Sequence, residues 1–203
     1  MTAMTTRTTN RIPASLRKRL KTTRRVSPDK KSLTEKAVNQ NEAVSVNMGK
    51  PVTAPCLIPV LHASTPKCIN SPFMVNGEPY GVTALSFGSP HGAVFVDDVD
   101  SVDVAALGAA LGTHALFPQG ASIVFAQVID KENVKARLWH RDHAGILFTP
   151  EAAAVAGTAA KMLQKVSSGD VAVSMSENTI NVGWNHGDDD AVLTGKASLF
   201  RTN

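Results

Sequence analysis

The sequence predicts an α+β fold in which short strands surround one buried helix. Residues 150–166 form a helical stretch that is apolar on nearly every side, and a helix of this kind is buried. Short runs rich in Val, Ile, Thr and Phe, bounded by Gly, Pro and Asn, occur both before and after that helix. Strands on both sides of one buried helix indicate a sheet wrapped around it.

Length and composition limit the possible classes. A chain of 203 residues with 43% hydrophobic residues fits one core-burying domain with an appendage. No apolar run approaches the ~20 residues that span a bilayer, so we expect no membrane contact. The two cysteines, Cys56 and Cys68, lack the spacing of metal ligands and favour a reduced, cytoplasmic compartment. We therefore expect neither a metal ion nor a cofactor.

Positive charge is concentrated at the start of the chain. Residues 1–50 contain 12 Lys and Arg against 3 Asp and Glu, a charge of +9, whereas residues 51–203 contain 9 against 14, a charge of −5. Residues 1–41 are expected to be a basic arm, partly disordered because they contain little to bury, followed by one domain at 42–203. The candidate binding residues of the arm are Arg11, Arg17, Lys18, Arg19, Lys21, Arg24, Arg25, Lys30 and Lys31.

The arm has three open interpretations. It is a solvated tail, or a contact with nucleic acid or an acidic protein, because clustered Lys and Arg release condensed counterions. The third is a targeting peptide, because residues 1–28 are rich in Arg, Ser and Thr and contain no acid. Ile12, Leu16 and Leu20 recur at helical spacing within the arm. No aromatic residue precedes Phe73, so stacking of the arm on bases has no support.

The domain begins with strands and turns. Asn76-Gly77 between two apolar runs is a strong signal for a β-hairpin. Four prolines between residues 51 and 66 exclude an interior strand there. Residues 102–111 are expected to be helical, with Ser101 as the cap. The strands are expected at 44–48, 73–75, 80–87, 91–96, 121–129, 134–140, 171–175, 179–184, 191–194 and 197–200.

The start of the long helix is clearly marked. Thr149 is a suitable cap, and Pro150 suits the first helical position. Glu151 places a carboxylate in the first turn, where it complements the helix dipole. Gly169 is the expected end of the helix.

Six short motifs follow one another in the domain. They are Val46-Asn47-Met48-Gly49-Lys50-Pro51, Phe87-Gly88-Ser89-Pro90-His91, Phe95-Val96-Asp97-Asp98-Val99, the run from Phe117 to Phe125, Leu138-Trp139-His140-Arg141 and Leu193-Thr194-Gly195-Lys196-Ala197. From about Ala43 onward, their order and spacing resemble the C-terminal lobe of diaminopimelate epimerase. The resemblance implies a single lobe, with a curled antiparallel sheet wrapped around the central helix at about 150–166. In that family the active site lies between two such lobes.

The chemistry of that family requires a thiol in each lobe, because the enzyme removes a proton from one face of Cα and returns one to the other. Residues 1–41 are too short and too polar to replace the first lobe. The second thiol should open the central helix within an Ala-Cys-Gly-Thr-Gly pattern. Here that run reads Phe-Thr-Pro-Glu-Ala, so Thr149 stands where the family has its thiol. The pKa of an unactivated hydroxyl is far too high for exchange of a Cα proton.

The binding features implied by the resemblance are altered as well. The family holds the substrate carboxylate on free N–H groups at the helix N-terminus, but Pro150 removes one N–H and Glu151 adds a negative charge there. Serines stand at two substrate-contacting Asn positions, and a histidine replaces a Glu. The vestigial positions are Ser89, His91, Ser122, His140, Arg141 and Thr149. Without a thiol beside it, His91 is expected to be a structural histidine. His140, Asp142 and His143 have no metal-ligand spacing.

Three functional hypotheses result. The first is a catalytically inactive scaffold, an adaptor or inhibitor that binds a protein partner or self-associates through the surface that faces the sister lobe in the family. The second is a nucleic-acid-binding accessory protein that uses the basic arm. The third is half of a split, cofactor-independent epimerase completed by another chain.

Overall fold

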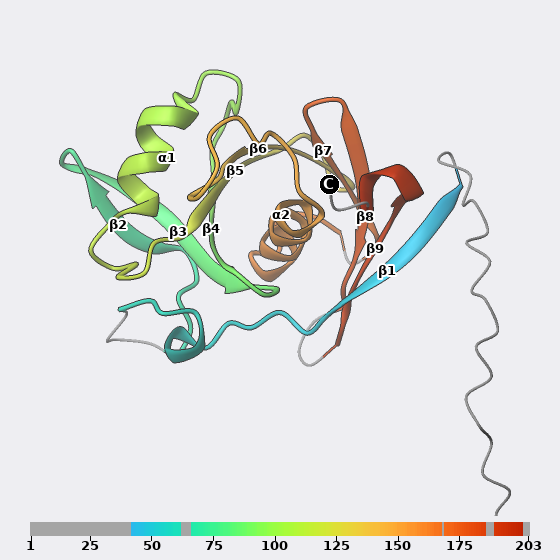
Figure 1. Ribbon diagram of the computed structural model, residues 1–203, viewed down its shortest axis with the longest axis horizontal. Helices are drawn as coiled ribbons and strands as arrows, with labels where there is room; N and C mark the ends of the chain where they lie inside the picture. The colour runs from blue at the N-terminus through green and yellow to red at the C-terminus, as the bar shows by residue number, and fades with distance from the viewer. Residues whose placement is uncertain (1–41, 62–65, 168, 186–188, 201–203) are drawn as a thin grey trace, which may run out of the picture. The chain divides into compact units, whose positions relative to one another are not determined.

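The computed structural model describes residues 42–61, 66–167, 169–185 and 189–200 (Figure 1). All of them belong to one of the two units into which the chain divides, residues 37–203. The basic arm and its candidate residues lie outside the described part of the chain. The domain boundary at 41/42 therefore stays a prediction.

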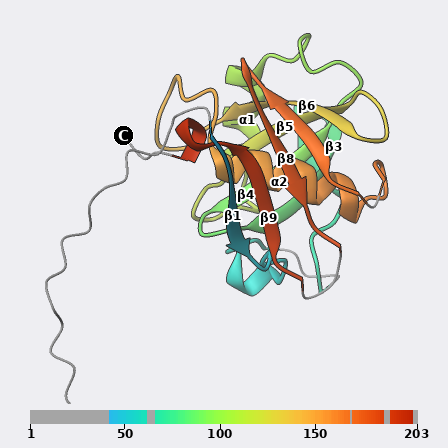
Figure 2. The ribbon, with the colours of Figure 1, turned by 90° about the vertical axis from the view of Figure 1, so that its right-hand side faces the viewer.

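Nine strands form one sheet in the order β1-β9-β8-β7-β6-β5-β4-β3-β2. The two strands nearest the ends of the domain in sequence, β1 and β9, pair antiparallel, as Figure 2 shows. The strands are β1 (Ala43–Gly49), β2 (Ser71–Val75), β3 (Glu78–Ser86), β4 (Pro90–Phe95), β5 (Ser122–Val128), β6 (Asn133–Trp139), β7 (Val171–Met175), β8 (Asn178–Gly183) and β9 (Ala191–Lys196).

The sheet is mixed, which corrects the expectation of an antiparallel sheet. Strand β4 pairs parallel with β5, and β6 pairs parallel with β7. Parallel neighbours need a crossover connection. Helix α1 (Val104–Gly112) lies in the first crossover and helix α2 (Pro150–Met162) in the second. The residue pattern of a single strand does not reveal the direction of its neighbours, so the two parallel pairs could not be predicted from the sequence.

The central strands bury both faces, and each face packs in a separate cluster. Leu85 and Ala93 belong to the cluster that contains α2. Their chain neighbours Ala84 and Val94 belong to the cluster that contains Leu111 of α1. Because successive side chains of a strand point to opposite faces, the two helices lie on opposite sides of β3 and β4.

The predicted burial of the long helix is confirmed. Every residue of α2 from Ala152 to Lys161 is buried, and the helix contacts strands β3 to β9. Figure 2 shows β8 and β9 in front of it. Small side chains allow this close packing: a Cβ added at Gly157 would lie 2.7 Å from Cβ of Val182.

The expected end of that helix at Gly169 is wrong, because α2 ends at Met162. Gln164 adopts a left-handed conformation with φ of 55°, and the Lys165 N–H donates to the Ala160 carbonyl. Lys161, which the sequence places at a polar end of the helix, is 1% exposed, and its Nζ donates to the Trp184 carbonyl at 2.9 Å.

Two further expectations are corrected. The cap of α1 is Asp103, whose Oδ1 accepts from the Ala106 N–H at 3.0 Å, whereas the Ser101 hydroxyl donates to the Asp98 carbonyl. Residues 197–200 form the 3-10 helix η3 (Ala197–Phe200) instead of a strand. The strand pairing of β1 with β9 ends at Ala43 and Lys196, and one further bond, from the Ala197 N–H to the Glu42 carbonyl, closes it where η3 begins.

The remaining elements follow the sequence closely. The hairpin of β2 and β3 turns at Asn76 and Gly77, which have φ of 52° and 87°. The proline-rich passage contains the 3-10 helix η2 (Pro55–Leu57) and one isolated bridge from Val52 to Ser86. Neither α-helix in the described residues combines the length and apolar character needed to cross a membrane.

Candidate functional site

The fold brings the vestigial positions together at one end of the central strands. His91 of β4 is the register partner of Ser122 of β5. The antiparallel pairing of β5 with β6 then places the end of β6, and with it His140 and Arg141, beside Ser122. The backbone N–H of Arg141 donates to the Ser122 hydroxyl at 3.3 Å.

The N-terminus of α2 satisfies its own backbone groups. The Thr149 hydroxyl accepts from the Ala152 N–H at 3.0 Å, so the predicted cap is confirmed. The Ala153 N–H donates to the Thr149 carbonyl at 3.2 Å. Pro150 has no N–H to offer. Few donors are therefore left at this helix end for an added anion.

Glu151 connects the helix to the turn between β3 and β4. Its Oε1 accepts from the Ser89 N–H at 2.9 Å and from the Ser89 hydroxyl at 3.1 Å. Gly88 beside it has φ of 136°, and a Cβ there would lie 3.6 Å from the same oxygen. Sequence reasoning placed Glu151 near the anion site but missed this contact, because the two residues are 62 positions apart and only the fold joins them.

His91 is 2% exposed and neutral at pH 7. Burial is the largest influence and lowers the pKa of its imidazole below 6.5, although the Ser89 carbonyl and Glu151 act in the opposite direction. Nδ1 lies 3.0 Å from the Ser89 carbonyl oxygen, to which it donates, and 4.0 Å from Oε1 of Glu151. The contact with Glu151 is therefore not an ion pair at neutral pH.

The arginine of the site is held by neighbouring groups. Nη1 of Arg141 donates to the Gly120 carbonyl at 3.2 Å, and Nε donates to Oδ2 of Asp142 at 3.0 Å. The rings of His140 and His143 stack with centroids 5.4 Å apart. Within the described residues, no group of three or more His, Cys, Asp or Glu is placed to hold a metal ion.

The two thiols of the chain lie elsewhere. Cys56 is exposed in η2. Cys68 is buried, its Sγ donates to the Val82 carbonyl at 3.8 Å, and burial raises the pKa of its thiol. The groups gathered at the site are consequently hydroxyls, the neutral imidazole of His91, the imidazole of His140, the hydrogen-bonded carboxylate of Glu151 and the guanidinium of Arg141.

Comparisons with known proteins identify the family of the chain. The sequence model of the family described as diaminopimelate epimerase matches residues 83–200, which run from β3 to η3. The chain belongs to the diaminopimelate epimerase family. All six vestigial positions of this family member lie inside the matched range.

Individual relatives give the same result. The chain is 30% identical over 165 residues to diaminopimelate epimerase of Oceanobacillus iheyensis, and the aligned region covers 81% of this chain and 57% of the relative. It is 31% identical over 159 residues to the enzyme of Desulforapulum autotrophicum, covering 78% and 56%. It is 32% identical over 158 residues to that of Desulfovibrio desulfuricans, covering 75% and 55%. This epimerase family member thus spans about half the length of the curated relatives it matches.

Proposed function

We propose that residues 42–203 are a catalytically inactive lobe of the epimerase fold, with its sheet curled around α2, that serves as a scaffold for a macromolecular partner. The contact of Glu151 with Ser89 is the observation that carries this proposal. A carboxylate of the chain itself is bound at the helix end where the family resemblance places the substrate carboxylate. A second carboxylate brought to the same place would meet like charge.

The missing thiol supports the same proposal. Thr149 stands at the family's thiol position, and its hydroxyl is engaged with the Ala152 N–H. A hydroxyl needs an adjacent base to act as a nucleophile or acid–base group. Among the described residues, no basic side chain forms a hydrogen bond with this hydroxyl, and Nδ1 of His91 is engaged with the Ser89 carbonyl.

The surface beside the site has the properties of a contact surface. A cavity of about 510 Å³ lies between residues 137–147 and the start of α1 at residues 102–105. Leu147 on its edge is 63% exposed. The lining also includes Trp139 and Ile146, and a hollow lined by aromatic and aliphatic side chains supports a protein contact here. We therefore place the partner, another protein or a second copy, on this surface.

Inactivity is tested by incubating the purified chain with diaminopimelate in heavy water and measuring deuterium at Cα by mass spectrometry. Diaminopimelate epimerase of Oceanobacillus iheyensis serves as the active control under the same conditions. We expect incorporation at the rate of the protein-free blank. Incorporation above the blank that disappears in the Thr149→Val variant would refute the proposal, because Val keeps the shape of Thr but has no hydroxyl.

The contact surface is tested with a matched pair of variants. Leu147→Glu places a charge on the proposed surface, whereas Ile129→Glu places the same charge on a side chain that is 54% exposed at the opposite end of β6. We expect that Leu147→Glu abolishes self-association, or the binding of a purified partner, and that Ile129→Glu does not. Sedimentation velocity measures both. Equal effects of the two substitutions would exclude this surface.

A further inference from the structure

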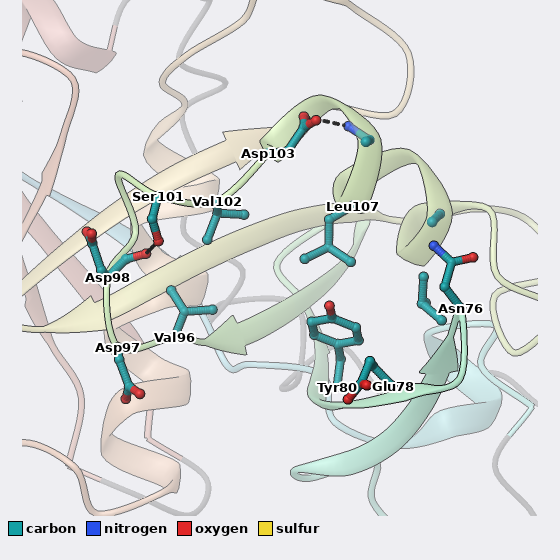
Figure 3. Close-up of a pocket in the computed structure, with 13 residues that line it drawn as sticks. Asn76, Glu78, Tyr80, Val96, Asp97, Asp98, Ser101, Val102, Asp103 and Leu107 are labelled. Atoms are coloured by element: carbon teal, nitrogen blue, oxygen red, sulfur yellow. Dashed lines mark hydrogen bonds between the residues drawn. The ribbon is translucent and has the colours of Figure 1, made fainter.

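A second cavity lies beside α1 and shares Val102 and Asp103 with the first. It has a volume of about 580 Å³ and is bounded by the β2–β3 hairpin, residues 96–103 and α1 (Figure 3). Small-molecule pockets commonly have volumes of about 300–1,000 Å³. Most of its lining is apolar, contributed by Val75, Val96, Val102, Ala106, Leu107 and Ala110.

This cavity is separate from the site at the N-terminus of α2. Strand β4 connects the two regions: His91 stands at its beginning, and Asp97 of the cavity follows its end. Six residues of extended chain at about 3.3 Å each place these two residues about 20 Å apart. A ligand of the cavity therefore does not occupy the vestigial site.

The charges that line the cavity are all negative. Glu78, Asp97, Asp98 and Asp103 contribute carboxylates, and none of its lining residues in the described part of the chain is Lys, Arg or His. Asp98 and Asp103 each accept a backbone N–H through Oδ1. Lys165 shares a smaller neighbouring cavity with Asp97 and partly offsets its charge. The backbone of Glu78 pairs with Val75 in the hairpin, but its carboxylate forms no hydrogen bond or ion pair with another described residue.

Tyr80 adds a second group suited to a cation. Figure 3 shows its ring below Leu107, and Glu78, two residues earlier on β3, lies on the same face of that strand. The half-buried side chain forms no hydrogen bond with another described residue, so its hydroxyl is open to a ligand. An ammonium group is attracted to the face of an aromatic ring and to a nearby carboxylate.

We propose that this cavity binds a small organic ammonium ion with an aliphatic or aromatic body. The body packs against Val96, Val102 and Leu107, while the ammonium group contacts Tyr80 and Glu78. Neutral analogues of the same shape lose the electrostatic contribution, and anionic analogues are repelled by the carboxylates. The inference does not depend on the catalytic state of the epimerase-like site.

Three probes of one shape separate these contributions: phenylbutylamine, phenylbutanol and phenylbutanoate. Each is titrated into the full chain at neutral pH, and binding is followed in two-dimensional amide NMR spectra, which also locate the site. We expect shifts at the residues of the cavity and an affinity for the amine about fivefold above that for the alcohol, with the acid weakest. The preference should shrink between about 0.02 M and about 0.5 M salt.

Variants then test which side chains bind the ammonium group and which bind the apolar body of the probe. Glu78→Gln should reduce the preference for the amine by about two- to fivefold and leave the alcohol unchanged, whereas Glu177→Gln, the same change in the β7–β8 turn, should have no effect. Ala106→Trp should weaken all three probes by filling the mouth of the cavity. Ala115→Trp, on an exposed residue after α1 that lines neither cavity, should not.

Several results would overturn the proposal. Equal binding of amine and alcohol, an unchanged preference in Glu78→Gln, shifts that map outside the cavity, or no binding of any probe each contradict it. Because all four substituted side chains are exposed, their folding can be verified by the same spectra before titration.

Discussion

A single carboxylate joins two parts of the domain that are distant in sequence. Glu151 accepts two hydrogen bonds from Ser89, one from the backbone and one from the side chain, and its own side chain is 28% exposed. Hydrogen bonds to an ionised group are stronger than those between neutral groups. This contact anchors the β3–β4 turn to the first turn of α2.

Removing that carboxylate should lower the free energy of unfolding. We expect Glu151→Ala to cost about 1–2 kcal/mol and Glu151→Gln less, since Gln retains an oxygen acceptor. Urea denaturation of Glu151→Ala, Ser89→Ala and the double variant measures the coupling between the two side chains. Additive losses in this cycle would show that the Ser89 hydroxyl contributes nothing to the anchor.

The buried imidazole makes stability depend on pH. Because the pKa of His91 is lower in the folded protein than its ordinary value of 6.5, the unfolded chain binds the proton first as the pH falls. The contribution is therefore complete above about pH 6.5 and decreases as the pH falls from there toward the lowered pKa. Hydrogen bonds lower the pKa of the Asp130 and Asp142 carboxyls below 3.8, so their contributions are lost only in more acidic solution.

His91→Asn should flatten this dependence. Asn places an N–H near the position of Nδ1, where it can still donate to the Ser89 carbonyl, but it does not titrate. We expect the parent to lose stability between about pH 6.5 and pH 5, and the variant to lose less. Urea denaturation across that range is the measurement. Parallel curves for parent and variant would mean that His91 is not the responsible group.

At the scale of the element, α2 organises the larger core, because the helix packs against seven of the nine strands in the described residues. Ala156→Asp should therefore remove most of the folding free energy, which is about 5–15 kcal/mol for a typical domain, since a buried charge without a partner is very costly. Thermal unfolding followed by circular dichroism measures the loss. Ala144→Asp, in an exposed loop, is the control and should melt like the parent.

The helices and strands that could be predicted from the sequence are those whose bounds are set by neighbouring residues. Hydrophobic pattern and turn residues located the β2–β3 hairpin and the start of α2, since Asn76-Gly77 and Thr149 act through their immediate neighbours. The parallel pairs of strands depend on contacts distant in sequence. The end of α2 is local, but its left-handed residue is Gln164 and no glycine marks the position. Strand direction leaves no trace in the residue pattern of one strand.

The candidate site also combines a feature that could be predicted from neighbouring residues with contacts that could not. Thr149 as cap could be predicted from the sequence, and the resemblance implied which positions gather around it. The two bonds from Ser89 to Glu151 and the bond from Arg141 to the Gly120 carbonyl could not, because they arise when separate loops meet. The acidic cavity around Tyr80 was missed for this reason too, since its lining comes from a hairpin, a loop and a helix.

At the scale of the whole molecule, positive and negative charge are concentrated in different parts of the chain. Residues 51–203 carry −5 and repel polyanions, whereas residues 1–50 carry +9. If the arm binds nucleic acid, the logarithm of affinity should fall with the logarithm of salt by about 0.7–0.9 per phosphate contact. Deleting residues 1–40 should then abolish a gel shift while the truncated domain elutes from a sizing column as a folded species. A truncated chain that still binds DNA or RNA would exclude the arm as the contact, and the acidic domain would have to bind through local positive groups such as Arg141.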